Sequence, residues 1–273
     1  MQVVSTIAEA RAARAALGPM GLVPTMGYLH DGHLSLVAQA KAHGGAVAAT
    51  IFVNPTQFGP NEDLSRYPRD LERDLRLLDA AGVDLVFTPS PEVMYPRGFD
   101  ARIEVGAITE KLEGAIRPGH FAGVCTVVAK LFNILQPERA YFGQKDAQQC
   151  AVIRRMVADL DMPVEILIGE TVREADGLAL SSRNVYLSPD QRAAAPALYQ
   201  ALLAARGAYA GGERRAEALR DAAKAKLSGA VIDYVSVADR VTLDELDLVT
   251  DGALVSLAVR FGATRLIDNL ILI

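Results

Sequence analysis

The chain has 273 residues, a formal net charge of −5 at pH 7 and a hydrophobic fraction of 51%. This length suffices for one main domain with a large core and a smaller second domain. The negative charge and the dispersed lysines and arginines argue against a general nucleic-acid or anionic-membrane surface, although they allow one local basic pocket. No apolar run reaches membrane-spanning length, and residues 1–9 lack the features of a secretion signal, so we expect a cytoplasmic protein.

The first part of the chain predicts a helix, a buried strand and a second helix. Thr6 and Glu9 have the spacing of a capping box before an alanine-rich helix. An apolar run at 20–23 then predicts a buried strand, and apolar residues at helical spacing from Leu34 predict a second helix. Residues 24–33 are therefore a strand-to-helix turn.

Two histidines, His30 and His33, lie in this turn at the expected entrance of the helix. A helix N-terminus offers unpaired N–H groups and the positive end of the helix dipole, which bind anionic oxygens. Two imidazoles there can donate to a phosphate whose charge grows in a transition state. Gly27 and Gly32 let the backbone approach a ligand closely. The turn therefore predicts a phosphate site.

A zinc pair and two solvated surface histidines are the alternatives for this turn. The other histidines, His43 and His120, belong to no Cys/His cluster of zinc-site spacing. Cys125 and Cys150 lie in apolar segments, which predicts packed thiols in place of a disulfide or a nucleophile. The pattern His-x-Gly-His after a strand resembles the signature of the nucleotidyltransferase superfamily, which implies activation by ATP and leaves the acceptor open.

Strands and helices continue to alternate along the first part of the chain. Further strands are predicted at 46–53, 83–88, 139–142 and 164–168, with a short one at 99–105, and helices at 70–81, 121–135 and 146–160. Residues 111–119 are polar and predicted to be exposed. The strand–helix alternation predicts an α/β fold, a Rossmann-like doubly wound parallel sheet with right-handed crossovers. The polar loop 54–61 follows the second of these strands at its carboxyl end, where such sheets bind ligands.

The pattern changes after residue 172. An alanine-rich helical region begins at Pro189 and is broken near 211–212, and strand-like runs follow at 231–237, 253–259 and 265–273. We therefore predict a Rossmann-like domain at 1–172 and a smaller mixed α+β carboxyl-terminal domain at 173–273.

Residues 143–146 follow a predicted strand and open a helix. Lys145 can place an ammonium on phosphate oxygens, and Asp146 can cap the helix, orient the lysine or hold a hydrated Mg²⁺. A surface turn with a charged cap is the alternative.

The segment 180–184 supplies two hydroxyls and a guanidinium from Ser181, Ser182 and Arg183. Arg183 can bind phosphate oxygens bidentately, and the serines can donate to them or face a metal-bound water. A solvated linker is the alternative. The position at the predicted domain junction favours function, because a closing domain can carry these donors onto a triphosphate and exclude water.

Gln57 and Gln149 lie at the ends of two predicted strands and suit a small polar substrate with hydroxyl and carboxylate groups. Glutamines in such places are usually solvent-exposed, so their chemistry alone does not single them out.

Together these motifs resemble the pantothenate synthetase family, and the resemblance runs in order from residue 23 to residue 184. It is carried by VPTMG at 23–27, LHDGH at 29–33, FVNPTQF at 52–58, RPGHF at 117–121, FGQKD at 142–146, QQ at 148–149 and READGLALSSRN at 173–184. Residue 144 is Gln where many family members carry Glu.

The resemblance implies an ATP-dependent ligase that joins (R)-pantoate to β-alanine through pantoyl adenylate, with release of pyrophosphate and AMP. It implies ATP contacts at Met26, Gly27, Tyr28, Leu29, His30, Asp31, Gly32, His33, Gly143, Gln144, Lys145, Asp146, Val172, Leu180, Ser181, Ser182 and Arg183. Among these it makes His33 the proton donor, and we expect His30, Lys145, Ser181, Ser182 and Arg183 to share in catalysis. Gln57 and Gln149 become the pantoate-binding pair, with Gln57 also near β-alanine.

The resemblance further implies that 1–172 binds ATP and pantoate, that 173–273 is a lid, and that the enzyme is a homodimer. Mg²⁺ is expected with ATP, its ligands left open, and no nucleic-acid or membrane partner is expected. A nucleotidylyltransferase that makes no amide and an inactive nucleotide-binding regulator are the alternatives. Gln57, Gln149 and the lack of a second phosphate motif argue against the first alternative, and the intact histidine, lysine and serine–arginine sets argue against the second.

Overall fold

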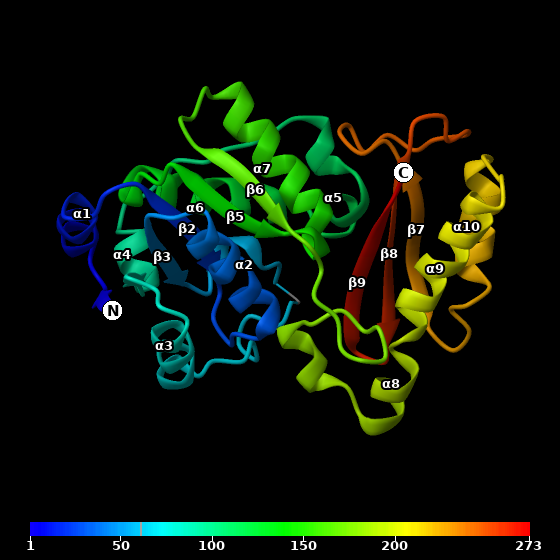
Figure 1. Cartoon of the computed structure of the whole chain (residues 1–273), viewed down its shortest axis with the longest axis horizontal. Helices are drawn as coiled ribbons and strands as arrows, with labels where there is room; N and C mark the ends of the chain where they lie inside the picture. Colours follow the sequence, from blue (N-terminus) through cyan, green and yellow to red (C-terminus); the bar gives the residue numbers. More distant parts are fainter. Residues whose placement is uncertain (61) are drawn as a thin grey trace. The chain divides into compact units, whose positions relative to one another are not determined.

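A parallel sheet of strand order β1-β4-β3-β2-β5-β6 forms the centre of the amino-terminal part of the chain in this computed structural model (Figure 1). Its strands are β1 Gln2–Val4, β2 Met20–Thr25, β3 Ala46–Ile51, β4 Leu85–Phe87, β5 Arg139–Gly143 and β6 Glu165–Gly169. The strand order reverses between β2 and β5, and ligands of such sheets bind outside the carboxyl ends of the strands at this point. The predicted doubly wound α/β fold is confirmed.

Helices join these strands. They are α1 Ile7–Ala15, α2 Asp31–Ala42, α3 Leu71–Ala80, α4 Pro91–Met94, α5 Leu112–Ile116, α6 His120–Leu135 and α7 Ala147–Asp159. α2 and α3 bury apolar residues such as Val37 and Leu78 against Val47 and Val86 of the sheet. α6 is buried along most of its length, and Arg14 of α1 donates to the carbonyl of Leu135 at its end, 2.8 Å away.

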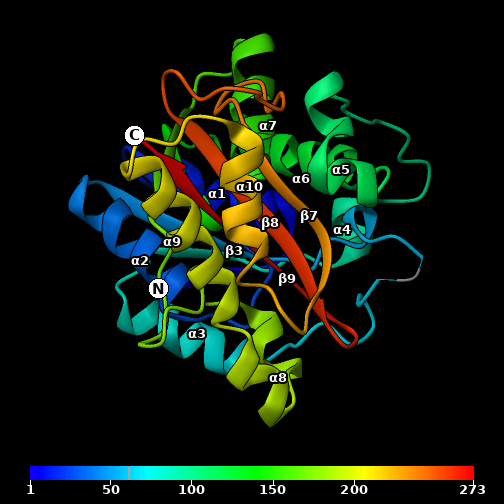
Figure 2. The same ribbon diagram turned by 90° about the vertical axis from the view of Figure 1, so that its right-hand side faces the viewer.

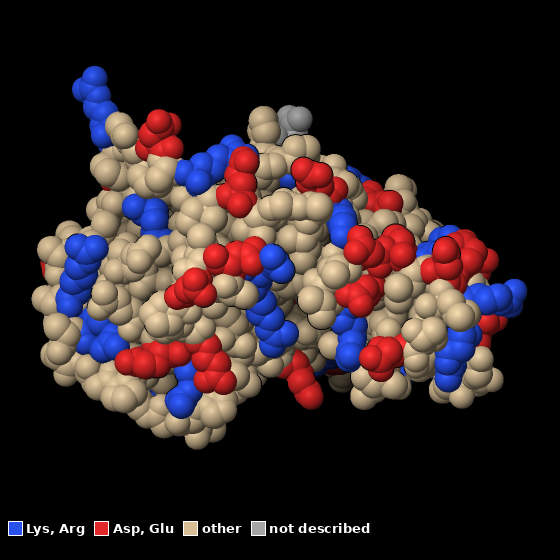
Figure 3. Space-filling view, turned by 90° about the horizontal axis from the view of Figure 1, so that it is seen from above, with Lys and Arg blue, Asp and Glu red and all other residues tan. Residues whose placement is uncertain are grey.

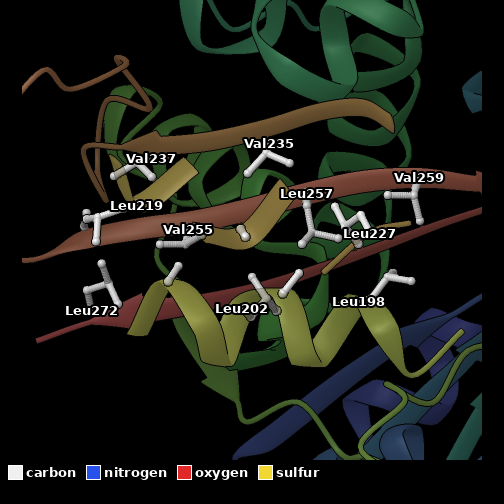
Figure 4. Packing of buried hydrophobic residues seen from close by; sticks show 14 of the residues in the cluster. Leu198, Leu202, Leu219, Leu227, Val235, Val237, Val255, Leu257, Val259 and Leu272 are labelled. Carbon is white, nitrogen blue, oxygen red and sulfur yellow. The ribbon is translucent and has the colours of Figure 1, made fainter. Parts of the chain in front are cut away.

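The carboxyl-terminal part has an antiparallel sheet, β7 Val231–Ala238, β8 Ala253–Phe261 and β9 Thr264–Leu272, in the order β7-β8-β9. The helices α8 Pro189–Ala194, α9 Ala197–Ala210 and α10 Ala216–Lys224 precede it, and α9 and α10 lie across one face of the sheet (Figure 2). Leucines of these helices, Leu198, Leu202 and Leu219, pack against valines and leucines of the strands (Figure 4). The predicted helical region, its break and its three strands are confirmed.

The structure describes residues 1–60 and 62–273, so Asn61 of the predicted loop 54–61 lies outside the described residues. The chain divides into two compact units, a first unit of 1–143 with 152–170 and a second unit of 144–151 with 171–273. The predicted boundary at 172/173 lies close to the passage at 170/171, whereas the place of 144–151 in the second unit has no counterpart in the sequence prediction. The assignment of 1–172 and 173–273 as functional domains stays a prediction.

Two local predictions need correction, and one strand was not predicted. β1 was not predicted, because its three residues are too few for a periodic pattern. The strand predicted at 99–105 is absent from this described segment, where the N–H of Ile103 donates to Thr126 Oγ1 at 3.0 Å. Residues 111–119 contain α5, in which Glu113 and Gly114 are buried, and a Cβ at Gly114 would lie 1.7 Å from the carbonyl oxygen of Thr109.

The prediction that both cysteines are packed thiols is confirmed. Cys125 and Cys150 are buried and form no disulfide, and burial raises the pKa of the Cys125 thiol to about 12. Acidic and basic side chains are interspersed over the face drawn in Figure 3. Each helix in the described part of the chain is too short or too polar to span a bilayer.

Candidate active site

The predicted histidine turn joins β2 to α2 in the first unit. His30 is the N-cap of α2, in an extended conformation, and His33 lies in the first turn of that helix. The backbone N–H of His30 donates to Nδ1 of His33 at 3.3 Å, and the two ring centroids are 4.0 Å apart. An Nδ1 that accepts carries no proton, so the neutral His33 ring holds its proton on Nε2 as a donor. The structure thus brings the two histidines together at a helix N-terminus, as predicted.

The carboxylate of Asp74 on α3 binds the backbone of this turn. It is 1% exposed and accepts from the backbone N–H of Tyr28 at 2.6 Å and of Leu29 at 2.8 Å. Burial raises the pKa of Asp74, an effect that these two hydrogen bonds only partly offset. Asp74 was not among the residues predicted for the site, although its position gives a signal, because it is a charged residue that shares a helix face with the apolar Leu71 and Leu78.

Gly27 is required at the start of the turn. Its φ is +83°, and a Cβ there would lie 2.9 Å from Ile51 Cγ2 and 3.0 Å from Asp74 Oδ2. Its N–H donates to Thr25 Oγ1 at 3.2 Å, and that hydroxyl in turn donates to the carbonyl of Thr50 at 2.6 Å. The turn is thereby tied to the ends of both β2 and β3.

Gln57 ends the short 3₁₀ turn Pro55–Gln57 after β3 and is 9% exposed. Asn54, 1% exposed, donates to Gln57 Oε1 at 3.0 Å and accepts from the Tyr95 hydroxyl at 2.7 Å. The Nε2 of Gln57 lies 3.2 Å from Met26 Sδ, which belongs to the histidine turn. Asn54 therefore engages the amide oxygen of Gln57 and turns its N–H donors toward the predicted nucleotide segment.

A partly buried polar cluster supports the backbone of Gln57. His120 Nδ1 lies 2.8 Å from the Gln57 carbonyl oxygen, and Arg117 Nη1 lies 3.1 Å from His120 Nε2. Arg117 also binds both carboxylate oxygens of Glu62, at 2.9 and 2.5 Å. Burial, with the neighbouring guanidinium, lowers the pKa of His120 to about 4. A neutral His120 that donates from Nδ1 and accepts at Nε2 fits both contacts.

The second unit contains the lysine and serine–arginine segments. Residues Gln144–Asp146 form a 3₁₀ turn before α7, in which Lys145 Nζ lies 3.7 Å from Asp146 Oδ1. Ser181 is the N-cap of the 3₁₀ turn Ser182–Tyr186, and its Oγ accepts from the N–H of Arg183 at 3.2 Å. Both turns contact β9.

Four other predicted site residues have clear positions. Val172 and Leu180 face each other across a short hairpin, with the Leu180 N–H donating to the Val172 carbonyl at 3.0 Å. Gly143 ends β5 in the first unit. Gln149 lies in the first turn of α7, in the segment 144–151 of the second unit, whereas Gln57 belongs to the first unit. Asn54, Asp74 and His120 are the residues that sequence reasoning did not select.

Comparisons with known proteins indicate the family of this chain. The family model for pantoate-beta-alanine ligase matches residues 2–271. The pantothenate synthetase of Chloroflexus aurantiacus strain J-10-fl is 63% identical, over 100% of this chain and 98% of that protein, and that of Chloroflexus aggregans is 64% identical, over 100% of both.

Two solved structures are also similar to this chain. Pantothenate synthetase from Thermus thermophilus superposes with a TM-score of 0.95 at 54% identity, covering 99% of both chains. The pantoate-beta-alanine ligase from Francisella tularensis, complexed with beta-gamma ATP and beta-alanine, has a TM-score of 0.82 at 36% identity, covering 99% of this chain and 97% of that one. The chain therefore belongs to the pantoate–β-alanine ligase family.

Proposed function

We propose that this chain condenses (R)-pantoate with β-alanine, using ATP, to give pantothenate, AMP and pyrophosphate. The match of the family model to residues 2–271 is the observation that carries the proposal. The paired histidines at the N-terminus of α2 supply chemistry that fits it, because they can stabilise charge on a phosphate.

The first step forms a bond between a pantoate carboxylate oxygen and the α-phosphorus of ATP, while the bond from that phosphorus to the bridging oxygen breaks and pyrophosphate leaves. His33, as the donor through Nε2, His30 and the N–H groups of α2 stabilise the charge on the α-phosphate. Lys145 and the segment Ser181, Ser182 and Arg183 bind the leaving pyrophosphate.

In the second step the amine of β-alanine attacks the carbonyl carbon of pantoyl adenylate, AMP leaves with the shared oxygen, and the nitrogen loses a proton. Both steps depend on positioning. Gln57 and Gln149 bind pantoate, with Gln57 also near β-alanine, and the oriented N–H donors of Gln57 suit a carboxylate or hydroxyl group.

We propose the remaining ATP contacts on the family resemblance. They are Met26, Gly27, Tyr28, Leu29, Asp31 and Gly32 in the histidine turn, Gly143, the backbone of Gln144, and Asp146 after β5, and Val172 and Leu180 of the hairpin.

The residues of this site suit Mg²⁺ only as an ion that is bound mainly by the phosphates of ATP. The described residues contain no group of three or more His, Cys, Asp or Glu side chains arranged to hold a metal. Mg²⁺ is usually held by one or two carboxylates together with substrate phosphates and water. Asp146, 48% exposed beside Lys145, is a carboxylate of this kind and would hold a hydrated ion on the phosphates, where the ion would neutralise charge.

We further propose a cytoplasmic homodimer that acts on small molecules and has no nucleic-acid or membrane partner. The family resemblance supports the dimer. The formal net charge of −5 and the interspersed charges on the face drawn in Figure 3 support the lack of a polyanionic partner. A monomer in sedimentation equilibrium at micromolar concentration would contradict the dimer.

Product analysis tests the proposed function. The chain should convert ATP, pantoate and β-alanine to equal amounts of pantothenate, AMP and pyrophosphate, as measured by mass spectrometry. An adenylylated product that accumulates without amide would favour a nucleotidylyltransferase, and binding of ATP without any product would favour a nucleotide-binding regulator.

A further inference from the structure

Two adjacent side chains of β9, Asp268 and Asn269, are polar and buried, at 2% and 4% exposure. Asn269 Nδ2 donates to the carbonyls of Gln144 at 2.9 Å and of Lys145 at 2.8 Å. Asn269 Oδ1 accepts from Gln144 Nε2 at 2.9 Å. Both polar atoms of the Asn269 side chain are therefore bonded to the turn that carries Lys145.

Asp268 is connected through Arg173 to 180–184, the second segment proposed to bind phosphate. The Arg173 guanidinium donates to both carboxylate oxygens of Asp268, at 2.6 and 2.9 Å, and to the Gly177 carbonyl at 3.1 Å. It also stacks 3.9 Å from the ring centroid of Tyr199. Arg173 and Ala179 pair across the hairpin that leads directly into the serine–arginine segment.

We infer that Asp268 and Asn269 are positioning residues for the pyrophosphate-binding groups of the second unit. Successive side chains of a strand point to opposite faces of the sheet. Asp268 and Asn269, although adjacent on β9, therefore bind two segments that are remote from each other in the sequence. Asn269 fixes the backbone of Lys145, and Asp268, through Arg173, fixes the start of the segment that contains Ser181 and Arg183. The inference rests on the proposed function, because that function makes Lys145 a phosphate ligand.

This arrangement also gives a reason why 144–151 belongs to the second unit. Gln144 and Lys145 bond to the side chain of Asn269, which belongs to β9 of that unit. Buried polar side chains keep their place only where their hydrogen bonds are made, and these bonds specify one position of the turn relative to β9. A displacement of about 1 Å of a catalytic group lowers rates by roughly 100-fold.

A double-mutant cycle with Lys145 tests the inference. Asn269→Ala should slow ATP–pyrophosphate exchange about 10- to 100-fold, while the reaction of preformed pantoyl adenylate with β-alanine stays close to the wild-type rate, because pyrophosphate has left by then. In a Lys145→Ala background, Asn269→Ala should slow exchange by less than about 3-fold, because Asn269 acts through Lys145. Equal losses in both backgrounds, or an equal loss in the amide step, would overturn the inference.

Two further variants separate positioning from folding. Ser256 pairs with Asn269 in the β8–β9 register and is buried, so Ser256→Ala is a matched control that should leave exchange within about 2-fold of wild type. If Asn269→Ala does not fold, Gln144→Ala removes the bond to Asn269 Oδ1 and leaves β9 intact. Gln144→Ala should slow exchange less than Lys145→Ala does. In the Lys145→Ala background, Gln144→Ala should cause no further loss of exchange.

If the proposed function is wrong, the wild-type protein itself will show no pantoate-dependent ATP–pyrophosphate exchange. Titration with a non-hydrolysable ATP analogue would then still test positioning. Asn269→Ala should weaken analogue binding in the wild-type background and leave it nearly unchanged in the Lys145→Ala background, and equal weakening in both would contradict the inference.

Discussion

Asp74 Oδ2 lies 2.6 Å from the backbone nitrogen of Tyr28. A side chain from α3 thus holds the loop that places the histidines at the N-terminus of α2, and the geometry of the proposed α-phosphate site depends on this buried carboxylate.

Asp74→Asn should lower the rate of adenylate formation. An amide keeps the size of the carboxylate but has one acceptor oxygen, so one of the two N–H groups now bonded to Asp74 loses its partner, at a cost of about 1–3 kcal/mol. We expect a lower free energy of unfolding and a slower first step, measured by urea titration and single-turnover kinetics. Unchanged values for both would show that Asp74 does not support the turn.

His33→Ala should leave the fold intact and slow adenylate formation by roughly two to three orders of magnitude, the usual scale for loss of one transition-state donor. Rapid-quench measurement of pyrophosphate release in a single turnover tests this. His43→Ala is the matched control, because His43 lies at the other end of α2, where it contacts the hydroxyl of Tyr141 on β5. Pyrophosphate release at the wild-type rate would remove His33 from the mechanism.

Gln149→Ala should weaken pantoate binding by about 1–3 kcal/mol, the cost of an unpaired buried polar contact, and leave ATP affinity nearly unchanged. Titration calorimetry with each ligand separates the two effects. If ATP and pantoate binding fall equally, Gln149 shapes the whole pocket and does not recognise the acid.

Lys145→Ala and Arg183→Ala should each slow adenylation, and the double variant should lose less than the sum of the two, because groups that act on one pyrophosphate are non-additive. Both residues belong to the second unit. Preformed pantoyl adenylate provides the control, since both variants should join it to β-alanine at close to the normal rate. An equal fall in that reaction would point to a general role in holding the site.

The partly buried His120 predicts a loss of stability in mild acid. Its pKa is about 4 in the folded protein against 6.5 for an ordinary histidine, so below pH 6.5 the unfolded chain binds a proton that the folded chain does not. Stability should fall as the pH falls from 6.5 to 4, by about 3 kcal/mol at most from this group. His120→Gln should flatten the dependence of unfolding free energy on pH over this range, and an unchanged slope would contradict the assignment.

The sequence predicted the elements that have strong periodic patterns. The apolar run of β2, the helical spacing of α2 and the three carboxyl-terminal strands lie where they were expected. β1 was missed because it is short, and α5 because polar composition does not show that Gly114 packs on a carbonyl. In the site, the histidine pair was predictable from chain proximity. Asp74, Asn54 and Asn269 were not, because each acts on residues that only the fold brings near.

Pantoate-dependent ATP–pyrophosphate exchange is the decisive measurement for the proposed function, because it isolates the formation of pantoyl adenylate from the amide step. The chain should exchange labelled pyrophosphate into ATP only when pantoate is present, without any need for β-alanine. Exchange in the absence of pantoate, or exchange that occurs only with a different acceptor, would contradict the proposed first step.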